Sequence, residues 1–174
     1  MAILPIITAP DPRLKLVCAP VERVDDDVRR LMDDMLETIH QAPGIGLAAP
    51  QMGITRRVIV VDIGGEDGEY DPHGMVNPEI LWASEALFDY EEGCLSLPDQ
   101  FALVGRPDEI RVRYLDRAGE TRELEAEGIL ATCIQHEMDH LEGVLFIDRI
   151  STLKRNIILR KLAKTRKQKA SASV

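Results

Sequence analysis

The segment from residue 129 to residue 141 constrains the fold most, because it combines apolar side chains with three ionisable groups. His136, Glu137 and His140 form a His-Glu-x-x-His pattern inside a largely apolar run (Ile129, Leu130, Cys133, Ile134 and Leu141). Residues four apart share one face of a helix, so both imidazoles can bind one metal ion and Glu137 can act as a general base. Buried ionisable groups need a partner. The run therefore predicts a buried helix with a metal site, rather than a surface helix with coincidental histidines.

Two histidines need at least one further protein ligand to hold a metal. The zincin class with a third histidine at the eleventh position of the motif is excluded, because Phe146 stands there. Downstream, Glu142 points away from His140 on the helix, and Asp148 is a weak candidate. Cys133 lies roughly 10 Å along the helix axis from His140, too far for one ion, so it packs beneath the site. The third ligand is expected upstream.

Upstream, Cys94 is the strongest candidate, because a glycine and polar residues flank its thiol in the segment 91–98. A buried, unreactive cysteine remains an equal alternative on these grounds. Cys18 and His73 are expected to be structural. His40 is expected to be an exposed imidazole at a helix C-terminus, stabilised by the helix dipole.

Periodicity predicts an α+β fold, with strands grouped between helices. The sequence indicates antiparallel or mixed sheets packed around the central helix, with an N-terminal helix and a C-terminal helix. The predicted helices cover residues 25–41, 128–141 and 151–167. The predicted strands cover residues 57–63, 109–115 and 121–127, the last two forming a hairpin, with shorter strands near 75–78 and 86–90.

Length and charge indicate one compact domain with a basic end. Residues 1–149 hold 13 basic and all 30 acidic residues, a formal charge of −17, which disfavours DNA binding. Residues 150–174 hold eight Lys or Arg and no acid, and residues 171–174 are expected to be disordered. This helix is either docked on the acidic body or contacts ribosomal RNA. The expected domain division is 1–150, catalytic, and 151–174, not independent.

The three cysteines do not suggest a disulfide framework. The N-terminus does not resemble a signal peptide, and no apolar run approaches the length of a membrane span. We therefore expect a cytoplasmic protein without membrane contact, and a monomer as the default.

Three segments together resemble the signature motifs of bacterial peptide deformylases. They are residues 44–51 (Gly-Ile-Gly-Leu-Ala-Ala-Pro-Gln), 92–96 (Glu-Gly-Cys-Leu-Ser) and 135–141 (Gln-His-Glu-Met-Asp-His-Leu). The order and spacing fit, and the resemblance extends from about residue 4 to residue 150. Alone, the glycine-rich segment is a weak signal for a flexible loop or a phosphate-binding turn. The turn is disfavoured because Pro50 and Gln51 stand where a helix with Lys or Ser/Thr would follow.

The resemblance implies a hydrolase that removes the formyl group from N-formyl-methionyl nascent peptides. Its metal ligands would be Cys94, His136 and His140. Glu137 would transfer the proton, and the Gln51 amide and Leu95 N–H would bind the oxyanion. The close main-chain approach that glycine allows would let substrate pair along Gly44, Ile45 and Gly46.

The expected cofactor is one divalent metal, Fe²⁺ first, with Zn²⁺, Ni²⁺ or Co²⁺ possible. The alternatives are a His-Glu-x-x-His metallopeptidase that cleaves internal peptide bonds, and a binding module with a structural metal. The first would need a downstream ligand, and the second would need a closed four-ligand site.

Overall fold

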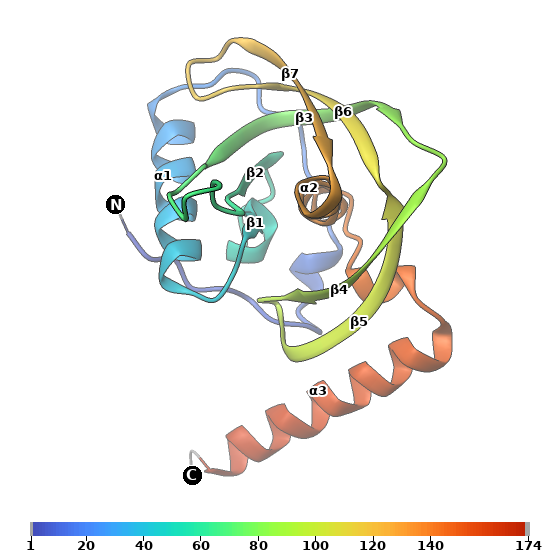
Figure 1. Ribbon diagram of the computed structural model, residues 1–174. Coiled ribbons are helices and arrows are strands. Elements are labelled where there is room, and N and C mark those ends of the chain that lie inside the picture. Colours follow the sequence, from blue (N-terminus) through green and yellow to red (C-terminus); the bar gives the residue numbers. More distant parts are fainter. Residues whose placement is uncertain (1, 173–174) are drawn as a thin grey trace.

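The computed structural model describes residues 2–172 and has the predicted α+β architecture (Figure 1). Its α-helices are α1 (Asp26–Gln41), α2 (Gly128–Leu141) and α3 (Thr152–Ala172). Short 3-10 helices are η1 (Pro12–Lys15), η2 (Ala49–Met52) and η3 (Phe146–Arg149). The predicted α1 and α2 agree with the structure to within one residue.

The strands form two antiparallel sheets. The larger sheet has the order β1-β2-β3-β6-β7, and the smaller one consists of β4 and β5. The strands are β1 (Gly46–Ala48), β2 (Val58–Val61), β3 (His73–Ala83), β4 (Leu87–Cys94), β5 (Leu97–Pro107), β6 (Glu109–Leu115) and β7 (Thr121–Glu127). The predicted hairpin is the β6–β7 pair, in which Glu109 lies opposite Glu127.

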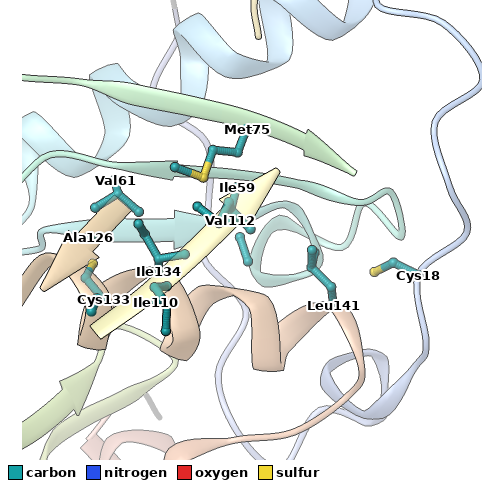
Figure 2. Packing of buried hydrophobic residues seen from close by; sticks show 12 residues of the cluster. Cys18, Ile59, Val61, Met75, Ile110, Val112, Ala126, Cys133, Ile134 and Leu141 are labelled. Atoms are coloured by element: carbon teal, nitrogen blue, oxygen red, sulfur yellow. The ribbon is translucent and has the colours of Figure 1, made fainter. Parts of the chain in front are cut away.

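Helix α2 lies at the centre of the molecule, seen almost end-on and surrounded by strands in Figure 1. It follows β7 without a linker, because Gly128 adopts a positive φ of 58° that turns the strand directly into the helix. Ile134 packs with Ile59, Val61 and other side chains of the larger sheet (Figure 2). This packing fixes α2 against the sheet.

Strand β2 is buried on both faces, which explains its continuous apolar sequence. Ile59 and Val61 belong to the cluster around α2, whereas Val58 and Val60 belong to the cluster around α1. Helix α1 begins at an Asp25 cap, whose side chain accepts the Val28 N–H at 3.0 Å. The larger sheet is therefore covered by α1 on one face and by α2 on the other.

Strand β3 is longer than its sequence predicts, and strand β5 was not predicted. β3 continues past Pro78 because the proline lies at a register shift, where a ladder hydrogen bond is not required. The preceding Asn77 has a φ of 51°, and its side chain makes two 2.8 Å hydrogen bonds to the backbone of Val21. β5, residues 97–107, was not predicted as a strand. The β4–β5 hairpin closes the molecule on the side of α2 opposite β2 (Figure 1).

Helix α3 packs along the β5 side of the body through Ile158 and Leu162, both buried. It extends to Ala172, so the prediction of disorder from residue 171 was wrong for the first two residues. Strong helix formers and the lack of a glycine or proline let the helix continue. Residues 173–174 lie outside the described residues. Within residues 2–172, no helix is both long and apolar enough to cross a membrane.

Candidate metal centre and active site

The structure brings Cys94, His136 and His140 together, although the first two are 42 positions apart in the sequence. One ligand atom from each lies within 4.8 Å of the others. The Cys94 Sγ and His140 Nε2 atoms are 3.4 Å apart. Cys94 is the last residue of β4, at a register shift before the turn into β5, and both histidines come from α2.

These distances fit a divalent metal ion. Metal bonds to sulfur and nitrogen are about 2.0–2.3 Å long, which places tetrahedral donors about 3–4 Å apart. Within residues 2–172, these three side chains are the only such group of His, Cys, Asp and Glu ligand atoms. Three protein ligands are typical of a catalytic metal site, whereas a closed structural site has four. The donor set therefore fits a metal centre with an open position.

Glu92 fixes the orientation of the His136 ring. Its Oε1 lies 2.8 Å from His136 Nδ1, which leaves Nε2 free to bind a metal. The same carboxylate accepts two hydrogen bonds from Arg106, at 2.6 and 3.0 Å, and Arg106 also donates to Asp139. Burial opposes ionisation of Glu92, but the hydrogen bonds from His136 and Arg106 outweigh it and lower the pKa of Glu92.

Glu137 is buried beside the donor set. Its Oε1 lies 4.0 Å from His136 Nε2, and its Oε2 is buried with no hydrogen-bond partner among the described residues. Burial raises the pKa of Glu137 to about 7, which the charge of His136 opposes. A carboxylate with such a pKa can both accept and release a proton near neutral pH.

Gln51 is held in one orientation by its neighbours. Its Oε1 accepts the Ala48 N–H at 2.9 Å, so its Nε2 points to the other side and donates to Ser96 Oγ at 3.1 Å. The second Nε2 hydrogen is directed toward Cys94 Sγ, a weak acceptor at 3.4 Å. The Gln51 amide therefore lies directly beside the donor set. Leu95 follows Cys94 in the turn between β4 and β5.

An open cleft of about 410 Å³ leads to these residues. Its walls come from residues 43–46, the β4–β5 hairpin and α2. A side chain at Gly46 would place its Cβ 2.8 Å from both Glu137 Oε1 and Cys133 Sγ, so only glycine allows this close approach. A larger hollow of about 580 Å³ lies beside Trp82 and contains none of these residues.

The other candidates considered from the sequence lie apart from the donor set. The Asp148 carboxylate contacts Leu145 N, Lys15 and Arg155, so it is not a metal ligand here. Cys133 packs beneath the site as predicted, with Sγ 3.6 Å from the Ile45 carbonyl. A downstream ligand of the kind a His-Glu-x-x-His metallopeptidase would use is therefore not present among residues 2–172.

The sequence analysis did not predict that Arg106 is buried beside the site. It is only 4% exposed and lies on the same face of β5 as the buried Val104. The alternation of β5 could have placed it inside, because residues two apart share a face of a strand. A buried arginine needs acidic partners, which are Glu92 and Asp139 here.

Residues 3–156 match the family model of polypeptide deformylases. The chain belongs to the polypeptide deformylase family. It is 58% identical over 170 residues to a peptide deformylase of Methylocella silvestris, covering 96% of this chain and 87% of that protein. The crystal structure of the peptide deformylase from Ehrlichia chaffeensis has a TM-score of 0.92 and 39% identity, covering 97% of this chain and 99% of that one.

A second similar structure is that of a class I type b peptide deformylase from Acinetobacter baumannii with bound Met-Ala-Ser. Its TM-score is 0.80 at 39% identity, and the match covers 86% of this chain and 99% of that one. The resemblance seen in the three sequence motifs is thus confirmed. The protein is a hydrolase of the metal-dependent deformylase family, which removes the formyl group from the N-terminus of newly made peptides and releases formate.

The contact between Glu92 and His136 generates a prediction. In Glu92→Ala, His136 loses its fixed orientation, so the affinity for Zn²⁺ should fall about 10- to 100-fold. The buried Arg106 also loses its main partner, which should lower the free energy of unfolding by about 3–5 kcal/mol. Competition with a chelator and urea denaturation measure the two effects. Glu91→Ala is the matched control, because the neighbouring Glu91 side chain is exposed; equal effects in both variants would contradict the role of Glu92.

Proposed function

We propose that deformylation is carried out by Glu137, Gln51 and Leu95, next to a metal ion held by Cys94, His136 and His140. The observation that carries this assignment is the buried, unpartnered Glu137 Oε2 beside three metal-ligand atoms at the end of an open cleft. A divalent ion bound there supplies Lewis-acid chemistry, lowering the pKa of water and polarising the formyl carbonyl.

In this proposal one side chain transfers the proton, and two N–H groups stabilise the developing negative charge. Glu137 accepts the proton of the attacking water and returns it to the amine that leaves as formate is released. The Gln51 Nε2 and the Leu95 N–H donate hydrogen bonds to the oxygen of the formyl group as it gains negative charge. The Gln51 contacts with Ala48 and Ser96 hold its amide in this orientation before substrate binds.

Gly44, Ile45 and Gly46 would bind the peptide main chain. β1 is at the edge of the larger sheet, so one side of it is not paired with another strand. An extended peptide can add to such an edge as an extra strand. Gly46 lies beside Glu137, whereas Gly44 lies beside Leu95, so the chain beyond the formylated residue would run along Ile45 toward Gly44.

Replacing the base tests this assignment. Glu137→Ala should retain its metal, because Glu137 is not a ligand, but should lose about 10²–10⁴-fold in kcat for formate release from formyl-Met-Ala-Ser. The metal content is measured on the same samples. Glu142→Ala, which removes a half-exposed carboxylate at the end of the same helix, is the matched control. Activity that survives in Glu137→Ala would overturn the proposed role.

We further propose Fe²⁺ as the native metal, although one thiolate and two imidazoles also suit Zn²⁺, Ni²⁺ or Co²⁺. The Cys94 side chain is only partly buried, so oxygen can reach a thiolate beside a redox-active ion. Such a site should be sensitive to oxidation.

The activity of the iron-loaded protein should therefore fall in air and return when Fe²⁺ is added anaerobically. The nickel-loaded protein, assayed in parallel, should keep its activity in air because its ion is not readily oxidised. Formate release after timed exposure to air measures both. If the iron-loaded protein were indifferent to oxygen, zinc would be favoured as the native metal.

A further proposal concerns helix α3 and the partners of the protein. The helix is anchored to the catalytic body by Ile158, Leu162 and the Arg155–Asp148 ion pair, which supports one domain rather than two. Exposed basic side chains cover much of its length (Lys154, Arg160, Lys161, Lys164, Arg166 and Lys167). We propose that the protein acts as a cytoplasmic monomer on nascent chains and that this helix contacts ribosomal RNA.

Charge reversal on α3 tests the ribosome contact. The triple variant Arg160→Glu, Lys161→Glu, Lys164→Glu should lose most of its co-sedimentation with ribosomes, and the loss should be larger at low salt. The matched control reverses three exposed arginines elsewhere, Arg111→Glu, Arg113→Glu and Arg122→Glu. Equal sedimentation of all three proteins would exclude the contact.

A further inference from the structure

The segment that leads from α1 into β1 forms one wall of the cleft and has little secondary structure of its own. Pro43, Gly44 and Ile45 line the cleft, and the following β1 is only three residues long. Strand β2 pairs with β1 on one side, and the other side faces the cleft. A peptide that adds to this edge needs the segment to be held in place, because main-chain hydrogen bonds require a fixed spacing.

Asp62, the first residue after β2, contacts the segment 43–45 on its β2 side. Its N–H donates to the Ile45 carbonyl at 2.8 Å, which continues the β1–β2 pairing by one residue. Its carboxylate is only 2% exposed and accepts the N–H groups of Gly64 and Asp71, at 3.0 and 2.9 Å. Asp62 therefore joins the cleft wall to both ends of the loop between β2 and β3.

His40 supplies the remaining contact of the Asp62 carboxylate. Its Nε2 lies 2.9 Å from Asp62 Oδ2, and its ring stacks on Tyr70 with centroids 4.0 Å apart. His40 was expected to be an exposed imidazole that only complements the helix dipole. The structure instead makes it the link between the last turn of α1 and the loop after β2, which lies beside α1 in Figure 1.

His40 and Asp62 contact the two ends of the cleft wall. His40 is placed just before the segment 41–45, and the Asp62 N–H binds the carbonyl at its end. The His40–Asp62 contact therefore fixes the distance between the two ends of this segment. Neither side chain lines the cleft, so any effect on substrate must pass through Gly44 and Ile45.

We infer that His40 and Asp62 are positioning residues for the substrate, which hold the Gly44–Ile45 wall so that the peptide chain beyond the formylated residue can pair with it. This inference rests on the proposed substrate-binding role of Gly44, Ile45 and Gly46. Loss of the contact weakens the binding of long substrates and leaves the chemistry at Glu137 unchanged. A contact that merely stabilised the loop would affect long and short substrates alike.

The test compares two substrates on the metal-loaded, full-length protein. Formyl-Met-Ala-Ser extends along the wall, whereas formyl-methioninamide ends near Gly46. In His40→Ala, the KM for the tripeptide should rise about tenfold, as expected for losing a hydrogen bond to a charged group, with kcat within about twofold of wild type. The KM for formyl-methioninamide should change by less than about threefold.

Two further variants sharpen the comparison. His40→Gln keeps an N–H that can donate to Asp62, so it should restore the tripeptide KM to within about threefold of wild type. His73→Ala is the matched control, because the His73 side chain is also 21% exposed and pairs with an aspartate of the same loop, Asp71, rather than with Asp62. Its KM values should equal those of wild type.

Hydrogen exchange supplies a readout independent of activity. The amides of residues 42–48 should exchange faster in His40→Ala than in His73→Ala. If His40→Ala fails to fold, Tyr70→Ala removes an exposed ring that stacks on His40 and should raise the tripeptide KM by about threefold.

An unchanged tripeptide KM, or an equal rise for both substrates, would overturn the inference. Activity that survives in Glu137→Ala would instead contradict the proposed site roles, so the two failures are distinguishable.

Discussion

The structure depends on burying His136, Glu137 and His140 in one central helix. Moving ionisable groups out of water is unfavourable unless each finds a partner, so the surroundings of α2 must supply them. The two sheets do this from opposite sides. The larger sheet packs against the apolar face of α2 through side chains such as Ile134, and the β4–β5 hairpin brings charged groups and the Cys94 thiol to the polar face.

The charges around the helix fall into two groups with different physical roles. Arg106 pairs with both Glu92 and Asp139, and Glu92 also contacts His136 Nδ1. The hydrogen bonds from His136 and Arg106 lower the pKa of Glu92, and Glu92 in turn fixes the His136 ring. Glu137 lacks such a partner for Oε2, so burial raises its pKa to about 7. The same low-polarity interior therefore contains one carboxylate whose pKa is lowered by its partners and one whose pKa is raised by burial.

The cleft shows how local sequence and distant contacts combine. Gly46 allows the edge strand to approach Glu137, which is a local property of glycine. The position of that strand depends on β2, Asp62 and His40, which are separated from it in the sequence. His40 was expected to be exposed because its position at a helix C-terminus accounts for a histidine without any tertiary contact. Nothing in the sequence indicates that Asp62 lies beside it.

The sequence by itself determined the α+β class, the helices α1 and α2, the β6–β7 hairpin and the two histidine donors, because periodicity and i,i+4 spacing are local properties. The sequence also indicated Cys94 as a candidate third metal ligand, and the resemblance to the family motifs favoured it over a buried, unreactive cysteine. Only the tertiary structure decided that Cys94 Sγ lies 3.4 Å from His140 Nε2, that Arg106 is buried against Glu92, and that His40 joins Asp62. These contacts join residues 14 to 46 positions apart, and chain packing rather than local propensity brings such residues together.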